Sequence, residues 1–104
     1  MSLEKPIGPE AILEKKKKYI MPCLAHFYKE PRQFVKGEMQ YLFDSEGRKY
    51  LDCFAGVSVI NCGHCNPEIN AEVVKQVQSL QHVCNTYLTE NFVNLAEKLA
   101  EVTP

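Results

Sequence analysis

The sequence predicts an α/β chain with a helical arm, an antiparallel hairpin and then two amphipathic helices. Two observations carry this prediction. Aromatic-rich runs flank an Asp-to-Gly turn at residues 44–47, and apolar residues recur at three- and four-residue intervals after residue 66. No sequential strand–helix–strand unit is visible, so these residues offer no obvious way to close the sheet. We therefore expect an incomplete domain, or one that a partner completes.

The first segment, residues 1–36, is expected to hold a helix and an extended arm. A proline directly after Gly8 predicts a helix that runs through about Ile20. The four consecutive lysines within it are best interpreted as a solvated helix face. Prolines and aromatic residues between Met21 and Pro31 predict an extended arm that lies on an apolar surface.

The second segment, residues 37–65, is the clearest β region. Residues 39–43 and 48–53 are the two strands of the predicted hairpin, and Gly47 supplies the left-handed position of its turn. A further short strand is expected at residues 57–60, because this run is rich in β-branched residues and has glycines on either side.

The third segment, residues 66–104, is expected to hold two helices. Asn66 followed by a proline is a strong start signal, since Asn caps a helix and proline fits its first turn. A second helix is expected from Thr89, and Pro104 would end it. The apolar face of the first helix is formed by Ile69, Val73, Val77, Leu80 and Cys84. That of the second is formed by Phe92, Leu95, Ala96, Leu99 and Ala100.

Composition narrows the classes of partner. The chain has 104 residues, of which 45% are hydrophobic and 24% charged, with a formal net charge of −1. This balance gives no general attraction to nucleic acid or to anionic membranes, and no run of apolar residues is long enough to span a bilayer. The first residues lack a signal core, and the five cysteines are an odd number. We therefore expect reduced thiols and a cytoplasmic location, without nucleic acid or membrane partners.

Cys62 and Cys65 allow two chemical alternatives. A Cys-x-x-Cys pair becomes a redox site when its first thiol lies at a helix N-terminus, but here the helix signal follows both cysteines. A thiol oxidoreductase is therefore the less favoured interpretation. The pair also has zinc-ligand spacing, to which His82 and Cys84 could add donors. Because Cys84 falls on the predicted apolar face, we interpret it as a buried structural cysteine and expect no metal site.

A longer pattern resembles a known family. Its members in this sequence are Gly37, Tyr41, Leu42, Phe43, Asp44, Gly47, Tyr50, Leu51, Asp52, Gly56, Gly63, His64, Cys65 and Pro67. At these spacings the chain closely resembles the N-terminal part of class III (subgroup II) aminotransferases, pyridoxal-phosphate enzymes of fold type I. The match continues to Pro104, and residues 27–31 are most similar to the alanine–glyoxylate aminotransferase 2 branch. The 4-aminobutyrate and ornithine branches are close competitors. Asn66 replaces the usual His of the family, and it preserves a good helix cap.

The resemblance implies a homodimeric enzyme that moves an amino group between an amine or amino acid and a 2-oxo acid. It also implies that the phosphate-binding turn, the acid that faces the pyridine nitrogen and the Schiff-base lysine all follow the equivalent of Pro104. We therefore expect an inactive fragment that holds no catalytic residue, does not bind pyridoxal phosphate covalently, and leaves its cofactor-binding residues unidentified. A non-catalytic dimerisation or structural module is the alternative.

The same resemblance implies three substrate-binding residues. Val57 and Ser58 would lie against the substrate, and Tyr87 would lie near the substrate or the neighbouring active site. The residues alone leave other interpretations open. Val57 also fits a core strand position, and Tyr87 also fits an interface or surface aromatic.

Overall fold

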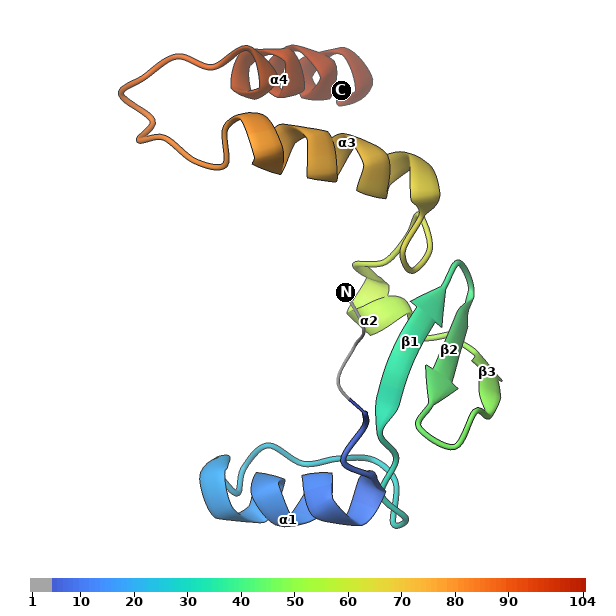
Figure 1. Cartoon of the computed structure of the whole chain (residues 1–104). Helices are drawn as coiled ribbons and strands as arrows, with labels where there is room; N and C mark the ends of the chain where they lie inside the picture. Colours follow the sequence, from blue (N-terminus) through green and yellow to red (C-terminus); the bar gives the residue numbers. More distant parts are fainter. Residues whose placement is uncertain (1–4) are drawn as a thin grey trace. The chain divides into compact units, whose positions relative to one another are not determined.

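The computed structural model describes residues 5–104, which form two compact units: one ends at Asn70 and the other is Ala71–Pro104. In chain order the elements are α1 (Pro9–Tyr19), β1 (Phe34–Glu38), β2 (Tyr41–Asp44), β3 (Lys49–Leu51), α2 (Ala55–Ser58), α3 (Pro67–Ser79) and α4 (Glu90–Val102) (Figure 1). The division between the units falls inside α3. The three segments predicted from the sequence, 1–36, 37–65 and 66–104, therefore stay a prediction.

Strands β1, β2 and β3 form one antiparallel sheet with β2 in the centre (Figure 1). Leu42 pairs with Gly37 on one side and with Tyr50 on the other. Gly47 has a φ of 81°, the left-handed conformation predicted for the turn between β2 and β3. The predicted hairpin is thus confirmed, and β1 adds a strand before it.

The prediction of a strand at residues 57–60 is wrong. Ala55–Ser58 form the single turn α2, whose four residues have φ values of 48°, 59°, 64° and 63°. The carbonyl of Phe54 accepts hydrogen bonds from the N–H groups of Val57 (3.1 Å) and Ser58 (3.3 Å). Local hydrogen bonds therefore override the β preference of this run, and a short apolar run carries too little periodicity to reveal that.

The three longer helices lie close to their predicted positions. α3 begins at Pro67, and the side-chain oxygen of Asn66 accepts a 3.0 Å hydrogen bond from the N–H of Glu68. α4 follows Thr89, although that side chain makes no capping hydrogen bond. Leu80 lies beyond the end of α3, so the predicted apolar face is shorter than expected. None of the helices among the described residues is long and apolar enough to cross a membrane.

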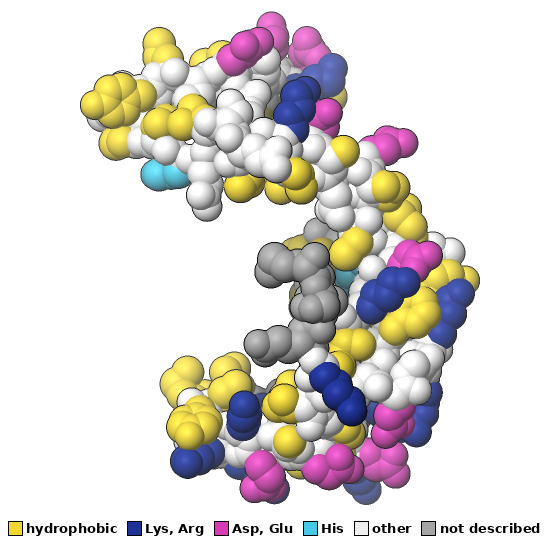
Figure 2. Space-filling model, in the orientation of Figure 1, with side chains coloured by type: hydrophobic (Ala, Val, Ile, Leu, Met, Phe, Trp, Pro, Cys, Tyr) yellow, Lys and Arg dark blue, Asp and Glu magenta, His cyan; other side chains and the backbone are white. Residues whose placement is uncertain are grey.

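No hydrophobic side chain among residues 5–104 is buried. The apolar side chains of α3 and α4 stay open, with Val73 at 53% and Phe92 at 63% exposure, and Figure 2 shows such side chains in yellow on the visible face. Soluble domains bury a core, and extended exposed apolar surface marks an interface. These faces are therefore candidates for an interface, and the incomplete domain stays a prediction.

Candidate functional site

The loop before α3 is bound to the sheet by its backbone. Met39 and His64 exchange two N–H to carbonyl hydrogen bonds of 2.7 Å each. Gly63 has a φ of 89°, and a Cβ there would lie 3.0 Å from the Cα of Met39. A Cβ on Gly37 would lie 2.7 Å from the Cβ of His64. The two glycines therefore permit a close backbone approach that larger residues would block.

Asp52 connects this loop to α2. Its Oδ2 lies 2.6 Å from Nε2 of His64, and its Oδ1 accepts the N–H groups of Phe54 (2.9 Å) and Ala55 (3.0 Å). The Asp52 side chain is 8% exposed and that of His64 is 19% exposed. The hydrogen bond from His64, followed by the two backbone hydrogen bonds, holds the pKa of Asp52 below its ordinary value. The carboxylate is therefore charged at neutral pH.

An open hollow of about 470 Å³ lies beside this pair. It is lined by Asp52 and His64 together with Ala55 of α2 and residues of the loop that leads to α3, including Ile60 and Asn61. The pairing of Asp52 with His64 spans twelve positions of the chain, and the sequence analysis missed it. The one available signal was that both residues belong to the longer family pattern.

The predicted substrate-binding residues are all at the surface. Val57 and Ser58 are neighbours on α2, and the Val57 side chain is 70% exposed. Tyr87 belongs to the other unit, where it is 69% exposed on the loop between α3 and α4. The alternative of a buried core strand position for Val57 is therefore wrong in this structure.

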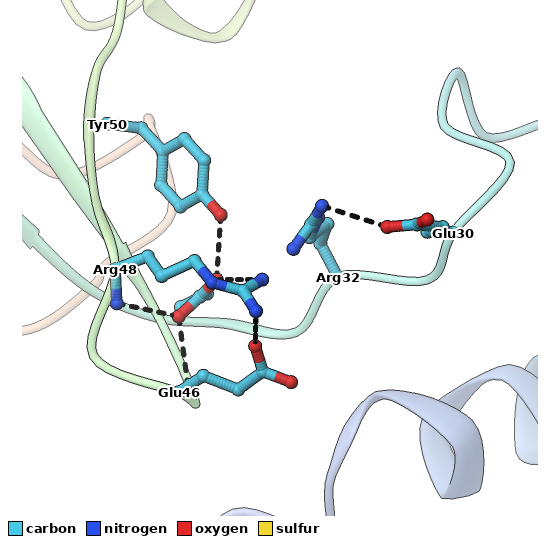
Figure 3. A network of polar contacts seen from close by, with 6 residues as sticks. Glu30, Arg32, Glu46, Arg48 and Tyr50 are labelled. Carbon is cyan, nitrogen blue, oxygen red and sulfur yellow. Dashed lines mark hydrogen bonds and ion pairs between the residues drawn. The ribbon is translucent and has the colours of Figure 1, made fainter.

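A second polar cluster surrounds Asp44, which is 4% exposed, and Figure 3 labels its members Glu46, Arg48 and Tyr50. Its carboxylate accepts hydrogen bonds from the N–H groups of Glu46 and Arg48 (2.9 Å each) and from the hydroxyl of Tyr50 (2.8 Å). Burial acts to raise the pKa of Asp44, but these hydrogen bonds and the Arg48 guanidinium together hold it below its ordinary value. The cluster closes the hairpin turn and has no spare group for catalysis.

The cysteines do not form a metal or redox centre in the described part of the chain. All five thiols are free and exposed, and no three His, Cys, Asp or Glu side chains of residues 5–104 gather around a metal position. Cys62 lies well before the start of α3, away from the helix terminus that a redox thiol needs. Cys84 is exposed and outside α3, so its interpretation as a buried cysteine is wrong.

Pyridoxal phosphate needs an amine for its aldehyde, an anchor for its phosphate and an acid beside its ring nitrogen. The lysines of residues 5–104 lie exposed or half-exposed, and none lines the hollow beside Asp52. Several of them pair with carboxylates instead, namely Lys17, Lys36, Lys75 and Lys98. The described residues therefore do not fit the cofactor as a complete site.

Comparisons with known proteins point to one family. The family described as "Aminotransferase class-III" matches residues 25–104. The chain is 44% identical over 99 residues to alanine–glyoxylate aminotransferase 2 homolog 2, mitochondrial, of Arabidopsis thaliana. This match covers 93% of this chain and 21% of that protein. It is 35% identical over 96 residues to acetylornithine aminotransferase of Methanosarcina mazei, covering 92% of this chain and 24% of that protein.

Two solved structures are also similar to this chain in fold. A phospholyase from Arthrobacter, in complex with phosphoethanolamine, has a TM-score of 0.78 at 28% identity and covers 89% of this chain and 21% of that one. Ornithine aminotransferase from Toxoplasma gondii ME49 has a TM-score of 0.78 at 25% identity and covers 93% of this chain and 22% of that one. The chain thus spans about a fifth of the length of the relatives that it matches.

Proposed function

Because the chain belongs to the class III aminotransferases, we propose that it is the N-terminal segment of an enzyme that moves an amino group between an amine or amino acid and a 2-oxo acid. The observation that carries the proposal is the match across residues 25–104, which contains the hairpin, α2 and the loop held by Asp52 and His64. Its fold is that of the corresponding part of fold type I aminotransferases, so the predicted fold class is confirmed.

In this proposal pyridoxal phosphate supplies the electron sink for the reaction when it is bound. In this proposal the described residues do not bind the cofactor covalently, and their task is to complete the substrate site. Val57 and Ser58 form one wall of that site, and Tyr87 contributes an aromatic side chain near it. The left-handed backbone of α2 supports this role for Val57 and Ser58, since strained backbone concentrates at functional sites.

A homodimer is part of the proposal. Its support is that the apolar faces of α3 and α4 have no cover among the described residues, and such faces mark interfaces. An amino donor and a 2-oxo acid acceptor are the proposed small-molecule partners. The cytoplasmic location stays a prediction, and the Arabidopsis relative carries a mitochondrial name. Fluorescent tagging of the complete open reading frame would test it.

The complete open reading frame that encodes this chain, expressed and supplied with pyridoxal phosphate, tests the function. Alanine, ornithine and N-acetylornithine serve as donors, with glyoxylate and 2-oxoglutarate as acceptors. We expect cofactor absorbance and amino transfer for at least one pair, and neither from residues 1–104 alone. Lack of transfer by the full protein with every pair would contradict an aminotransferase. It would favour the structural module, which size-exclusion chromatography at several concentrations would reveal as an inactive dimer.

A further inference from the structure

The turn α2 holds four consecutive residues in the left-handed region, and only Gly56 among them is suited to it. L-residues resist this conformation because Cβ approaches the following carbonyl, and a β-branched residue such as Val57 tolerates it least. Such a turn persists only where its surroundings hold it.

The turn is held at its start by Asp52. The Oδ1 atom of Asp52 accepts the N–H groups of Phe54 and Ala55, at 2.9 and 3.0 Å, which fixes the two residues that open the turn. The carbonyl of Ala55 then accepts the N–H groups of Val59 (2.9 Å) and Ile60 (3.0 Å) and closes it. Ala55 takes part in both sets of hydrogen bonds, and the other three left-handed residues of α2 lie between Ala55 and the donors of the second set.

Asp52 is itself fixed to the sheet from two directions. Its N–H donates to the carbonyl of Gln40 at 2.9 Å, directly after β3 ends. Its Oδ2 contacts Nε2 of His64 at 2.6 Å, and the backbone of His64 is bound to that of Met39. Asp52 thus ties three parts to each other: its carboxylate holds the turn and the loop before α3, and its backbone N–H holds the hairpin.

We propose that Asp52 is a positioning residue for the substrate wall, and this rests on the proposed function of Val57 and Ser58. Its two oxygens have separate tasks. Oδ1 sets the left-handed turn that presents Val57 and Ser58, and Oδ2 holds the loop that carries His64. Asp52 affects binding of the amino donor only through the position of this turn, and it does not contact the donor. Loss of Oδ1 therefore alters the recognition of the donor.

Two substitutions separate the tasks. Asp52→Ala removes both acceptors, whereas Asp52→Asn keeps a carbonyl oxygen for Phe54 and Ala55 and loses the charge opposite His64. Asp44→Asn is the control for loss of a carboxylate elsewhere in the hairpin, because the buried Asp44 carboxylate also accepts two backbone N–H groups but anchors the other end of the hairpin. All three are made in the complete open reading frame with pyridoxal phosphate bound.

We expect Asp52→Ala to raise the KM for the amino donor roughly tenfold with a smaller fall in kcat, because small displacements of positioning groups have large effects. It should also weaken the discrimination between short and long donors. Asp52→Asn should recover most of the donor KM, and Asp44→Asn should leave it near the wild-type value. Equal KM values for Asp52→Ala and Asp44→Asn in an active enzyme would overturn the inference and leave the proposed function standing.

Hydrogen exchange of the same proteins gives a readout that does not depend on activity. In Asp52→Ala the N–H groups of residues 57–60 should exchange about tenfold faster than in wild type, since local opening becomes easier. Asp44→Asn should leave them unchanged. Unchanged exchange in Asp52→Ala would overturn the anchoring of the turn. A folded wild-type protein that transfers no amino group would instead overturn the substrate role together with the proposed function.

Discussion

Substitution of Gly63 by alanine should open the contact between the loop before α3 and the sheet. Gly63 has a φ of 89°, and an alanine in left-handed backbone costs about 1–2 kcal/mol. The new Cβ would also lie 3.0 Å from the Cα and 3.3 Å from the carbonyl carbon of Met39, which are backbone atoms and cannot move aside easily. Forced contacts of this kind cost about 1–3 kcal/mol. The two effects together predict a loss of about 2–5 kcal/mol.

Two other glycines separate these effects. Gly47 has a φ of 81° and nothing within 4 Å of an added Cβ, so Gly47→Ala carries the backbone cost alone. Gly37 has ordinary backbone, but its Cβ would lie 2.7 Å from the Cβ of His64, so Gly37→Ala carries the contact cost alone. The loss for Gly63→Ala should therefore exceed that of Gly47→Ala by about 1–3 kcal/mol.

Native-state hydrogen exchange at the N–H groups of Met39 and His64 is the assay. These groups donate to each other's carbonyls, so their exchange reports the opening of this contact directly. Each 1.4 kcal/mol lost should speed exchange about tenfold. The reasoning would be refuted if Gly63→Ala and Gly47→Ala changed exchange at Met39 and His64 equally, because the close approach would then carry no energy.

Other consequences can be measured on the complete open reading frame. The pKa of Asp52 is lowered in the folded chain, so its stabilising contribution is complete above its ordinary pKa of 3.8 and is lost as the pH falls through the folded value. Acid unfolding curves of wild type and Asp52→Asn should therefore converge at low pH, and curves that stay apart there would contradict this. Tyr50→Phe removes the hydroxyl that donates the 2.8 Å hydrogen bond to Asp44 and should lower the urea midpoint less than Asp44→Ala does. The opposite order would argue against Asp44 as the centre of that cluster. Hydrogen bonds from the side chain and backbone of Thr86 lower the pKa of the Cys84 thiol, so Thr86→Val should slow the alkylation of Cys84 near neutral pH. An unchanged rate would show that the hydroxyl does not affect this thiol.

Residues close together in the chain explain what the sequence predicts well. The hairpin depends on a turn around Gly47, and the start of α3 depends on Asn66 and the proline after it. These signals act over a few residues, so they survive without tertiary packing. The family pattern adds long-range information, because its fixed spacing reflects a fold in which Asp52 and His64 meet.

The two wrong predictions, a strand at residues 57–60 and a buried Cys84, share one cause. The run at residues 57–60 has the composition of a strand, but hydrogen bonds at both ends turn Ala55–Ser58 into a left-handed turn. Cys84 has helix spacing, yet α3 ends at Ser79. In both places the intrinsic preference amounts to a fraction of a kcal/mol per residue, and contacts with neighbouring groups exceed it.

The sequence by itself determined the hairpin, the helix starts and the family. Tertiary structure alone decided that Asp52 joins His64 across twelve positions, and that one carboxylate holds both a strained turn and a loop. The physical reason is that local signals act through backbone preference and nearby hydrogen bonds. A contact between side chains twelve positions apart, such as that of Asp52 with His64, instead depends on where the folded sheet brings distant groups.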